Sequence, residues 1–467
     1  MELEFSGAAR QVTGSLTILR ACGRTIMIDC GLQQGGDEAE WGQELPLKAS
    51  EVDSVLLTHA HIDHSGRIPM LYKDGYEGLV HCTGATEDLC SIMLLDSAYI
   101  QENDAEWQTR KALRAGKDPV EPIYTVQDAQ RALQGFESHE YNDKFELFPG
   151  IQARFVDAGH LLGSASIELS VTEGGRTRKL VFSGDIGNLD QPIINDPEYL
   201  KKADAVVMES TYGDRKHDGH MESTKQRADE IRKIVEDTFA RGGNVIIPSF
   251  SVGRTQEILY IFRYLYYNEN FSVPVFVDSP LSVKATGVFS RNIIGYFDEE
   301  AMKVFDEGQN PILFPNLITV TDVADSKALN DRRESSVIIS SSGMCEAGRI
   351  RHHLKHNLWR RECSVVFTGY QAPGTLGNKI ESGAQSVKIF GEDIAVRAQI
   401  FKLEGISGHA DKDGLIRWLE AFDPKPAQVF VVHGEQETAL KFTDTIRSLG
   451  YNADCPSPGD ICQIAMN

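Results

Sequence analysis

Short apolar runs alternate with polar turns along the first part of the chain. The runs LEFSG, GSLTILRA, TIMIDCG and DSVLLTH are rich in Val, Ile, Leu and Thr, as β-strands are. The segment 86–115 has apolar positions at helical spacing, which predicts a helix. The runs IQARFVDAGH, ASIELSVTE and KLVFSGDIG predict further strands. This part of the chain is therefore expected to form a β-rich α/β domain.

From about residue 225 the pattern changes. Four units combine a strand, a Gly-containing loop and a helix: NVIIPSFSVGRTQEILYIFRYL, VPVFVDSPLSVKATGVF, SVIISSSGMCEAGRIRHHLKHNL and CSVVFTGYQAPGTLGNKI. Such alternation predicts a parallel sheet flanked by helices. After about 386 the β-rich style returns. We expect a β-rich α/β domain interrupted by a Rossmann-like insert, with three domains in series as the alternative.

Composition and charge narrow the classes of protein to which the chain can belong. The chain has 467 residues, of which 41% are hydrophobic and 25% charged, as in soluble globular proteins. The net charge of −21 argues against a basic surface for nonspecific nucleic-acid binding, although it leaves room for a local positive groove. The chain shows no secretory leader, no membrane-length apolar run and no C-x-x-C pair among its eight cysteines. We therefore expect a cytoplasmic protein that does not enter a membrane.

The segment LLTHAHIDHSGRIP, residues 56–69, is unusually rich in histidine. His59 and His61 are two residues apart, so in extended backbone they point the same way. Asp63 and His64 follow where the chain begins to turn, and they aim elsewhere. A polar loop that happens to be His-rich is the simple alternative, but this spacing rarely arises by chance. The loop is therefore predicted to offer two ligand pairs to two neighbouring cations.

Further ligands are expected at the ends of other strands, where open sheets place their sites. His160, Asp185 and His433 each come directly after a strand-like run. Each alone is typical of a turn, but their repetition at strand ends indicates a site. The first cation is expected to take His59, His61 and His160, the second Asp63, His64 and His433, with Asp185 bridging them.

The expected donor set also predicts the metal. Imidazoles combined with carboxylates suit Zn²⁺ best, so we expect two Zn²⁺ per chain, with Mn²⁺ or Fe as the alternative. Two divalent ions exceed the negative charge of two aspartates and one hydroxide. The centre is therefore expected to attract an anion.

With these residues in view, the chain resembles a metallo-β-lactamase-fold hydrolase and, more closely, a β-CASP ribonuclease. That group includes the pre-mRNA 3′-end-processing endonuclease and its bacterial and archaeal relatives. The resemblance covers nearly the whole chain. It rests on GAARQVTGS, MIDCG with Asp29, the His-rich loop, His160, Asp185, Glu209 in MESTYGDR, His409 in GISGHAD and His433 in VVHGE.

The resemblance implies a fold and a substrate. The fold would be an αββα sandwich with an inserted β-CASP domain, divided as 1–210 and 386–467 for the sandwich and 211–385 for the insert. A histidine at position 433 resembles the RNA-acting branch of the family. The implied activity is hydrolysis of single-stranded RNA, by internal cuts, from the 5′ end, or both. The family also implies a homodimer.

The chemistry of two-metal phosphodiester hydrolysis further predicts roles for individual residues. Asp63, besides binding metal, would take a proton from the attacking water. His409 would act as the general acid, oriented by Glu209. Asp29 would hold the outer nitrogen of a ligand histidine, or else serve as a turn residue.

Three Gly-containing loops of the insert precede helices, where backbone N–H groups favour phosphate. Ordinary tight-turn chemistry is the alternative for each loop. The candidate RNA-phosphate contacts are Arg254, Ser342, Gly343, Thr375 and Lys379.

Two other functions stay open at this point. A small-molecule hydrolase of the thioesterase or lactonase kind uses the same metal loop, because the fold alone does not determine function. Such an enzyme would not need the large insert. A non-catalytic RNA-binding subunit is the second alternative, although such subunits usually lose metal ligands.

Overall fold

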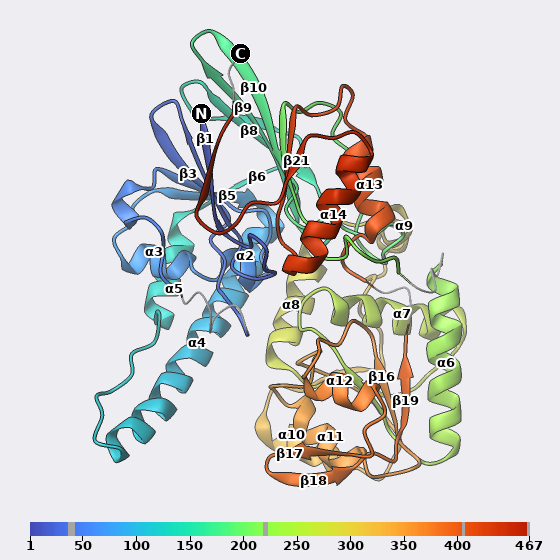
Figure 1. Ribbon diagram of the computed structural model, residues 1–467. Coiled ribbons are helices and arrows are strands. Elements are labelled where there is room, and N and C mark those ends of the chain that lie inside the picture. Colours follow the sequence, from blue (N-terminus) through green and yellow to red (C-terminus); the bar gives the residue numbers. More distant parts are fainter. Residues whose placement is uncertain (36–42, 218–222, 404–406, 465–467) are drawn as a thin grey trace. The chain divides into compact units, whose positions relative to one another are not determined.

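The computed structural model describes residues 1–35, 43–217, 223–403 and 407–464. The chain forms two compact units (Figure 1). Unit 1 comprises Met1–Leu189, Asp196–Lys216 and His409–Asn467, and unit 2 comprises Asp190–Asn195 and His217–Gly408. Unit 2 is thus an insertion in the sequence of unit 1.

Unit 1 contains two seven-stranded sheets. The first has the order β22 (Asp460–Gln463), β1 (Glu2–Gly7), β2 (Leu16–Ala21), β3 (Arg24–Ile28), β4 (Ser54–Leu56), β5 (Leu79–Thr83) and β6 (Phe136–His139). Its strands β3, β4, β5 and β6 are parallel, whereas β22, β1, β2 and β3 pair antiparallel. The second sheet has the order β21 (Ala453–Asp454), β20 (Gln428–Val431), β11 (Ala205–Met208), β10 (Arg176–Phe182), β9 (Ala165–Glu173), β8 (Ile151–Asp157) and β7 (Lys144–Phe148).

The two sheets pack face to face around one apolar core. Strand β8 shows the alternation that this requires, because Ile151, Ala153 and Phe155 are buried while Gln152 between them is exposed. These three side chains belong to the same core as Leu3 of the first sheet. Each sheet therefore turns one apolar face toward the other.

Helices cover the outer faces of the two sheets. Leu415, Trp418 and Leu419 of α13 recur at helical spacing and pack with Val429 of the second sheet. Helix α4 contacts β5 and β6 of the first sheet. The αββα arrangement expected from the sequence is confirmed. Among the described residues of unit 1, the helical segments are η1 (Ala49–Glu51), α2 (Ile62–Ser65), α3 (Ile68–Lys73), α4 (Gly84–Arg114), α5 (Val126–Ala132), η2 (Leu133–Gly135), α13 (Lys412–Glu420) and α14 (Gln436–Ser448).

Unit 2 is built on a six-stranded parallel sheet. Each of the four predicted strand–loop–helix units contributes one strand to it, followed by a helix as expected. The strand order is β14 (Leu317–Thr319), β13 (Val275–Val277), β15 (Val337–Ser340), β12 (Val245–Pro248), β16 (Ser364–Phe367) and β19 (Gln399–Lys402). The helices are α6 (Thr224–Ala240), α7 (Arg254–Asn268), α8 (Pro280–Arg291), α9 (Glu299–Asp306), α10 (Val323–Asn330), α11 (Ile350–Asn357) and α12 (Leu376–Glu381).

The segment after 385 differs from the sequence-based boundary. The sequence predicts 386–467 as part of the sandwich domain, but β19 pairs with β16 of unit 2. The hairpin of β17 (Ser386–Ile389) and β18 (Glu392–Ala395) places Val387 and Ile389 in the core of unit 2. Shared pairing and packing therefore keep this segment with unit 2, and the chain rejoins unit 1 at His409.

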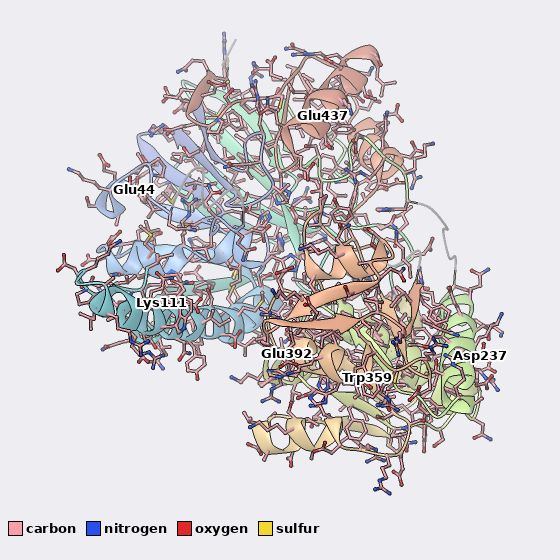
Figure 2. All side chains as sticks on the ribbon, turned by 60° about the horizontal axis from the view of Figure 1, so that its bottom comes forward. Glu44, Lys111, Asp237, Trp359, Glu392 and Glu437 are labelled. Carbon is pink, nitrogen blue, oxygen red and sulfur yellow. The ribbon has the colours of Figure 1, made fainter. Side chains whose placement is uncertain are left out.

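Acidic side chains lie on the surface of both units. Glu437 of α14 and Asp237 of α6 are exposed and project from their helices (Figure 2). None of the helices in the described ranges combines the length and apolar character that a membrane crossing requires.

Candidate metal centre

The expected site residues of unit 1 lie just beyond the ends of its strands. The His-rich loop follows β4, and α2 begins within it, so Asp63 and His64 lie on a first helical turn. Strands β8, β10, β11 and β20 run in one direction, so their carboxyl ends share one edge of the second sheet. Within three residues of these ends come His160 after β8, Asp185 after β10, Glu209 after β11 and His433 after β20.

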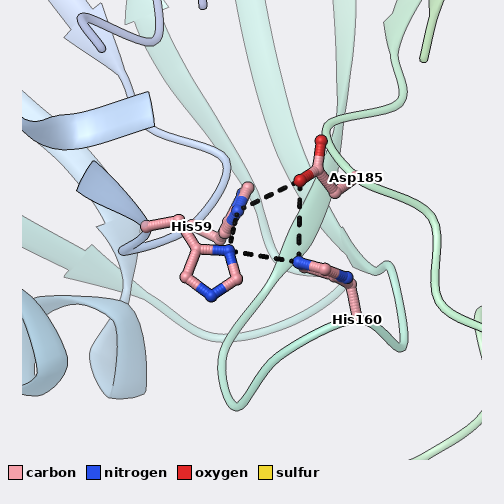
Figure 3. A group of neighbouring side chains, drawn as sticks. His59, His160 and Asp185 are labelled. Atoms are coloured by element: carbon pink, nitrogen blue, oxygen red, sulfur yellow. Dashed lines mark hydrogen bonds and ion pairs between the residues drawn. The ribbon is translucent and has the colours of Figure 1, made fainter. Parts of the chain in front are cut away.

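The first predicted ligand group converges on one point. His61 Nδ1 lies 3.0 Å from His59 Nε2 and 3.2 Å from His160 Nε2. Asp185 Oδ2 lies 3.5 Å from His59 Nε2 and 3.6 Å from His160 Nε2. Figure 3 shows His59, His160 and Asp185 directed toward one another. Four donor atoms from three separate segments thus face a common centre.

The second predicted group converges beside it. His64 Nε2 lies 3.1 Å from His433 Nε2, and His433 Nε2 lies 3.6 Å from Asp63 Oδ2. Asp185 Oδ1 lies 3.3 Å from His64 Nε2 and 3.7 Å from His433 Nε2. The two carboxylate oxygens of Asp185 therefore divide between the groups, as a bridging ligand requires.

Hydrogen bonding alone does not account for these contacts. His61 Nδ1 faces two ring nitrogens at once, although a ring nitrogen has only one proton or one lone pair in the ring plane. Asp185 Oδ1 is buried and accepts no hydrogen bond from the described residues. Cations that receive the lone pairs of these nitrogens and carboxylates resolve both conflicts. The donor set therefore fits metal ions.

Burial and charge keep two of the candidate ligands, His59 and Asp185, in the forms that metals bind. Burial lowers the pKa of His59, so its imidazole is neutral at pH 7. Burial raises the pKa of Asp185, but His433, His64 and His59 outweigh it and hold that pKa well below the usual range. A neutral imidazole and an ionised carboxylate are the metal-binding forms. For His64 and His433 burial lowers the pKa, but the charge of Asp185 outweighs it and raises the pKa, so a cation would displace a proton there.

Asp29 contacts a ligand candidate on the side that faces away from the proposed ions. Its Oδ2 is 2.7 Å from His64 Nδ1, and its Oδ1 accepts from the backbone N–H of Thr58 at 2.8 Å. The Thr58 hydroxyl lies 3.1 Å from His59 Nδ1. When Nδ1 of His64 donates to Asp29, its Nε2 lone pair points into the site. The structure thus brings Asp29 to the outer nitrogen of a ligand candidate.

Two threonines were missed by the sequence reasoning. Thr58 contacts His59 as described, and Thr211 Oγ1 lies 3.1 Å from His433 Nδ1. Each threonine is a common strand-end residue, so its type carries little information. Position offers the only signal, because Thr58 directly precedes His59 in the His-rich loop and Thr211 lies in the motif with Glu209.

Glu209 and His409 form a pair beside the two ligand groups. His409 Nδ1 lies 3.2 Å from Glu209 Oε2 and 4.0 Å from Asp185 Oδ2. Glu209 is itself fixed, because its Oε1 accepts from the backbone N–H of Ile186 at 2.5 Å. Burial lowers the pKa of His409, but Glu209 and then Asp185 outweigh it and raise that pKa to about 9. The pair can hold a proton next to the ligand groups.

The candidate phosphate contacts lie in unit 2. The carbonyl oxygen of Gly343 accepts from Gln371 Nε2 at 3.1 Å, so the loop with Ser342 and Gly343 touches the loop leading to Thr375. Lys379 lies on the exposed side of α12. These two loops therefore form one local surface at the ends of β15 and β16.

Several of the candidate phosphate contacts are already engaged. Arg254 pairs with Glu257, and their side chains are only 10% and 8% exposed. Thr375 caps α12, and the backbone N–H of Leu376 donates to Glu346. A phosphate would have to displace these partners, so the structure gives Arg254 and Thr375 a role inside unit 2.

Three family profiles match the chain. The beta-lactamase superfamily domain matches residues 24–238 and the Beta-Casp domain matches 255–380. A Zn-dependent metallo-hydrolase RNA specificity domain matches 393–456.

Several curated proteins are similar over most of their length. Ribonuclease TTHA0252 of Thermus thermophilus is 39% identical over 93% of this chain and 93% of that protein. An RNase J-like protein of Methanocaldococcus jannaschii is 30% identical over 99% of both chains. Transcription termination factor FttA of the same organism is 31% identical over 96% of this chain and 69% of its own length.

A solved structure adds support for the fold alone. A protein of unknown function from Enterococcus faecalis V583 superposes with a TM-score of 0.53 at 12% identity, over 99% of both chains.

Proposed function

The chain belongs to the β-CASP metallo-β-lactamase ribonucleases, and on this premise we propose that it hydrolyses phosphodiester bonds of single-stranded RNA with two Zn²⁺ ions. One observation carries the proposal: the two oxygens of Asp185 divide between two groups of converging imidazoles and carboxylate. The matched RNA specificity domain and the relative named as a ribonuclease support RNA as the substrate. Internal cuts, removal of 5′ nucleotides, or both are compatible with this chemistry.

The ligands proposed for the first ion share one carboxylate with those for the second. Imidazole-rich donor sets with few carboxylates favour Zn²⁺, with Mn²⁺ as the alternative. When bound, two zinc ions activate water near neutral pH and offset the charge of the phosphate. The proposed holders are His59, His61 and His160 for one ion, Asp63, His64 and His433 for the other, and Asp185 for both.

Asp63 is proposed to take the proton of the attacking water. One of its oxygens faces His433 at 3.6 Å, which leaves the second oxygen for this task. Its side chain is 21% exposed, so substrate and water can reach it, whereas Asp185 is 2% exposed. A carboxylate within reach of the nucleophile is the group that general-base catalysis needs.

His409 is proposed to protonate the leaving ribose 3′-oxygen. Glu209 faces its Nδ1 and stabilises the protonated ring, so the proton for the leaving group would come from Nε2. Glu209 acts here as a positioning residue, since it touches His409 and the backbone of Ile186. Pairing a carboxylate with an imidazole keeps the acid charged until it donates.

RNA contacts in unit 2 are proposed for the surface formed by Ser342, Gly343 and Lys379. Lys379 is the exposed cation of this group, and its charge would attract a backbone phosphate. Lys379→Ala is expected to weaken RNA binding and to reduce its salt dependence. Arg254 and Thr375 stay candidates only if RNA displaces their present partners.

The experiment that tests the function is cleavage of end-labelled single-stranded RNA by the purified protein, with its metal content measured. The wild type is expected to cut RNA and to carry about two zinc ions in this centre. His64→Ala is expected to lose both the activity and zinc from the centre. The product ladder separates internal cuts from 5′-end removal.

The controls make the outcome specific. His356→Ala changes an exposed histidine of α11 and is expected to cut like the wild type. A DNA of the same sequence tests the choice of substrate. Tightly bound zinc without cleavage of RNA or DNA would overturn the proposal and direct attention to thioester and lactone substrates.

A further inference from the structure

A second cluster of metal-binding side chains lies on the first sheet of unit 1. His81 is on β5, and Glu137 and His139 are on the neighbouring strand β6 (Figure 1). His81 pairs in register with Glu137, and His139 is two residues further along, so all three side chains lie on one face of the sheet. None of them belongs to the dinuclear centre proposed above.

The three side chains place one donor atom each around a common point. His81 Nδ1 lies 3.0 Å from His139 Nε2. Glu137 Oε1 lies 3.8 Å from His81 Nδ1 and 3.6 Å from His139 Nε2. Bonds of about 2.0–2.1 Å to a tetrahedral zinc put ligand atoms about 3.3–3.4 Å apart. The observed separations lie on both sides of that value, so small side-chain shifts suffice.

A hydrogen bond explains only part of this arrangement. One ring can donate to the other at 3.0 Å, which satisfies the two imidazole nitrogens. The carboxylate of Glu137 lies beyond hydrogen-bond length of both nitrogens. It is nearly equidistant from the two nitrogens, as a third ligand to a shared cation would be.

Packing holds the two rings in place. The ring of His139 stacks on Phe145 with centroids 3.6 Å apart and planes 8° apart. Phe145 in turn stacks on Phe155, whose ring belongs to the core between the sheets. Ligands fixed on strands and supported by packing are already oriented for metal binding.

The protonation state of the rings suits a metal as well. Burial lowers the pKa of His81 to about 4, and burial also lowers the pKa of His139. Both rings are therefore neutral at pH 7, which is the ligand form. The side chains of His81 and His139 are 9% and 14% exposed, whereas Glu137 is 48% exposed. An ion could thus enter from the side of the carboxylate.

We propose that His81, Glu137 and His139 form a mononuclear Zn²⁺ site that fastens strand β6 to β5. Within the described residues, strand β6 is the last strand of its sheet and has only four residues, so it pairs there on one side alone. A metal ion bound by side chains of both strands would connect β5 and β6 in addition to their backbone hydrogen bonds. Three protein ligands leave a fourth position for water. Two imidazoles and one carboxylate favour zinc over the oxygen-preferring ions Mg²⁺ and Ca²⁺.

The test is a zinc titration of the full-length, metal-stripped protein, with bound zinc measured at buffered free zinc. The wild type is expected to bind one zinc more than Glu137→Gln or His139→Gln. In Glu137→Gln the affinity for this ion is expected to fall at least tenfold, because even outer-shell changes cost about 10–100-fold. Glu137→Gln keeps the size of an exposed side chain, so it should fold.

Glu140→Gln is the matched control, because it removes the same charge from an exposed position three residues away. It is expected to bind as much zinc as the wild type. The double variant His59→Ala/His64→Ala isolates the site, since it should lose the dinuclear centre and keep one zinc. Equal zinc binding by the wild type, Glu137→Gln and His139→Gln would overturn the proposal.

Discussion

At the scale of single residues, Asp29 links the backbone to the candidate metal centre. Its Oδ1 accepts from the backbone N–H and the hydroxyl of Thr58, and its Oδ2 lies 2.7 Å from His64 Nδ1. Its φ of 61° is a left-handed value that Asp and Asn adopt more readily than most residues. One carboxylate thus fixes both the start of the His-rich loop and the orientation of a ligand candidate.

Asp29→Asn is expected to weaken metal binding by about 10–100-fold. Asn tolerates the left-handed backbone, but its amide NH₂ cannot accept from His64 Nδ1 while its oxygen serves Thr58. Competition with a chromogenic chelator measures the affinity. The control Asp53→Asn changes a carboxylate that accepts from Thr25 in the same unit, and it should leave the affinity unchanged. An Asp29→Asn protein that binds metal like the wild type would contradict the role of Asp29.

Glu209→Gln is expected to lower kcat while zinc content stays at the wild-type value. The glutamine keeps the shape of the side chain but loses the charge that stabilises protonated His409. Positioned acids contribute about 10²–10⁴-fold to a rate, so the loss should reach at most that range. Steady-state kinetics with RNA, together with metal analysis, measures it. A normal kcat in Glu209→Gln would remove Glu209 from the proposed mechanism.

At the scale of elements, the apolar pattern predicted most strands and the loops after them. His160, Asp185 and His433 could be proposed as ligands because each directly follows a β-rich run. The membership of β19 could not be predicted, because its short run Gln-Ile-Phe-Lys fits a strand of either sheet equally well. Only its pairing with β16 decides the question. The cluster around His81 was missed for a related reason, since strand register is not visible in one sequence.

Asp298, at the start of α9, should make the free energy of unfolding depend on pH. It caps the helix, and its Oδ1 accepts from the backbone N–H of Ala301 at 2.7 Å. Burial raises its pKa to about 6, above the usual value near 3.9. The folded state therefore binds more protons between pH 4 and 6, so its stability falls as pH rises through that window. The loss is at most about 3 kcal/mol.

Asp298→Asn should remove this dependence, because Asn caps helices as well as Asp. The variant is expected to match the wild type at pH 4 and to be more stable at pH 7. Urea denaturation at both pH values measures the difference in the free energy of unfolding. The same difference at both pH values would contradict the raised pKa of Asp298.

Phe430 connects the core between the sheets to the strand that leads to His433. It is 1% exposed, and its ring centroid lies 5.0 Å from that of Phe5. Phe430→Ala is expected to destabilise unit 1 by about 3–5 kcal/mol, because it leaves a cavity in a packed core. Leu440→Ala, at a position 39% exposed, should change stability by less than about 0.5 kcal/mol. Similar unfolding curves for both variants would contradict this account of the core.

At the scale of the whole molecule, the chain is divided into two units with separate cores. The cores that contain Phe155 and Trp418 belong to unit 1, and the core that contains Phe367 belongs to unit 2. The sequence predicted such an insertion from the change in pattern near 225. It also predicted that His433 joins ligands far earlier in the chain, because three serial domains would separate them. Every proposed metal ligand lies in unit 1.

Removing the metal should therefore lower the thermal stability of unit 1 and leave that of unit 2 unchanged. A ligand that binds the folded state stabilises it, by about 4 kcal/mol at a free concentration 1,000-fold above Kd. Chains with separate cores unfold in more than one step. Calorimetry of the zinc-loaded protein is expected to show two transitions, of which chelation lowers the Tm of only one. Phe430→Ala should lower the Tm of that same transition, which assigns it to unit 1. Chelation that lowers both Tm values equally, or a single melting step, would mean that the metal stabilises both units together. Either result would contradict the prediction that the two units unfold independently.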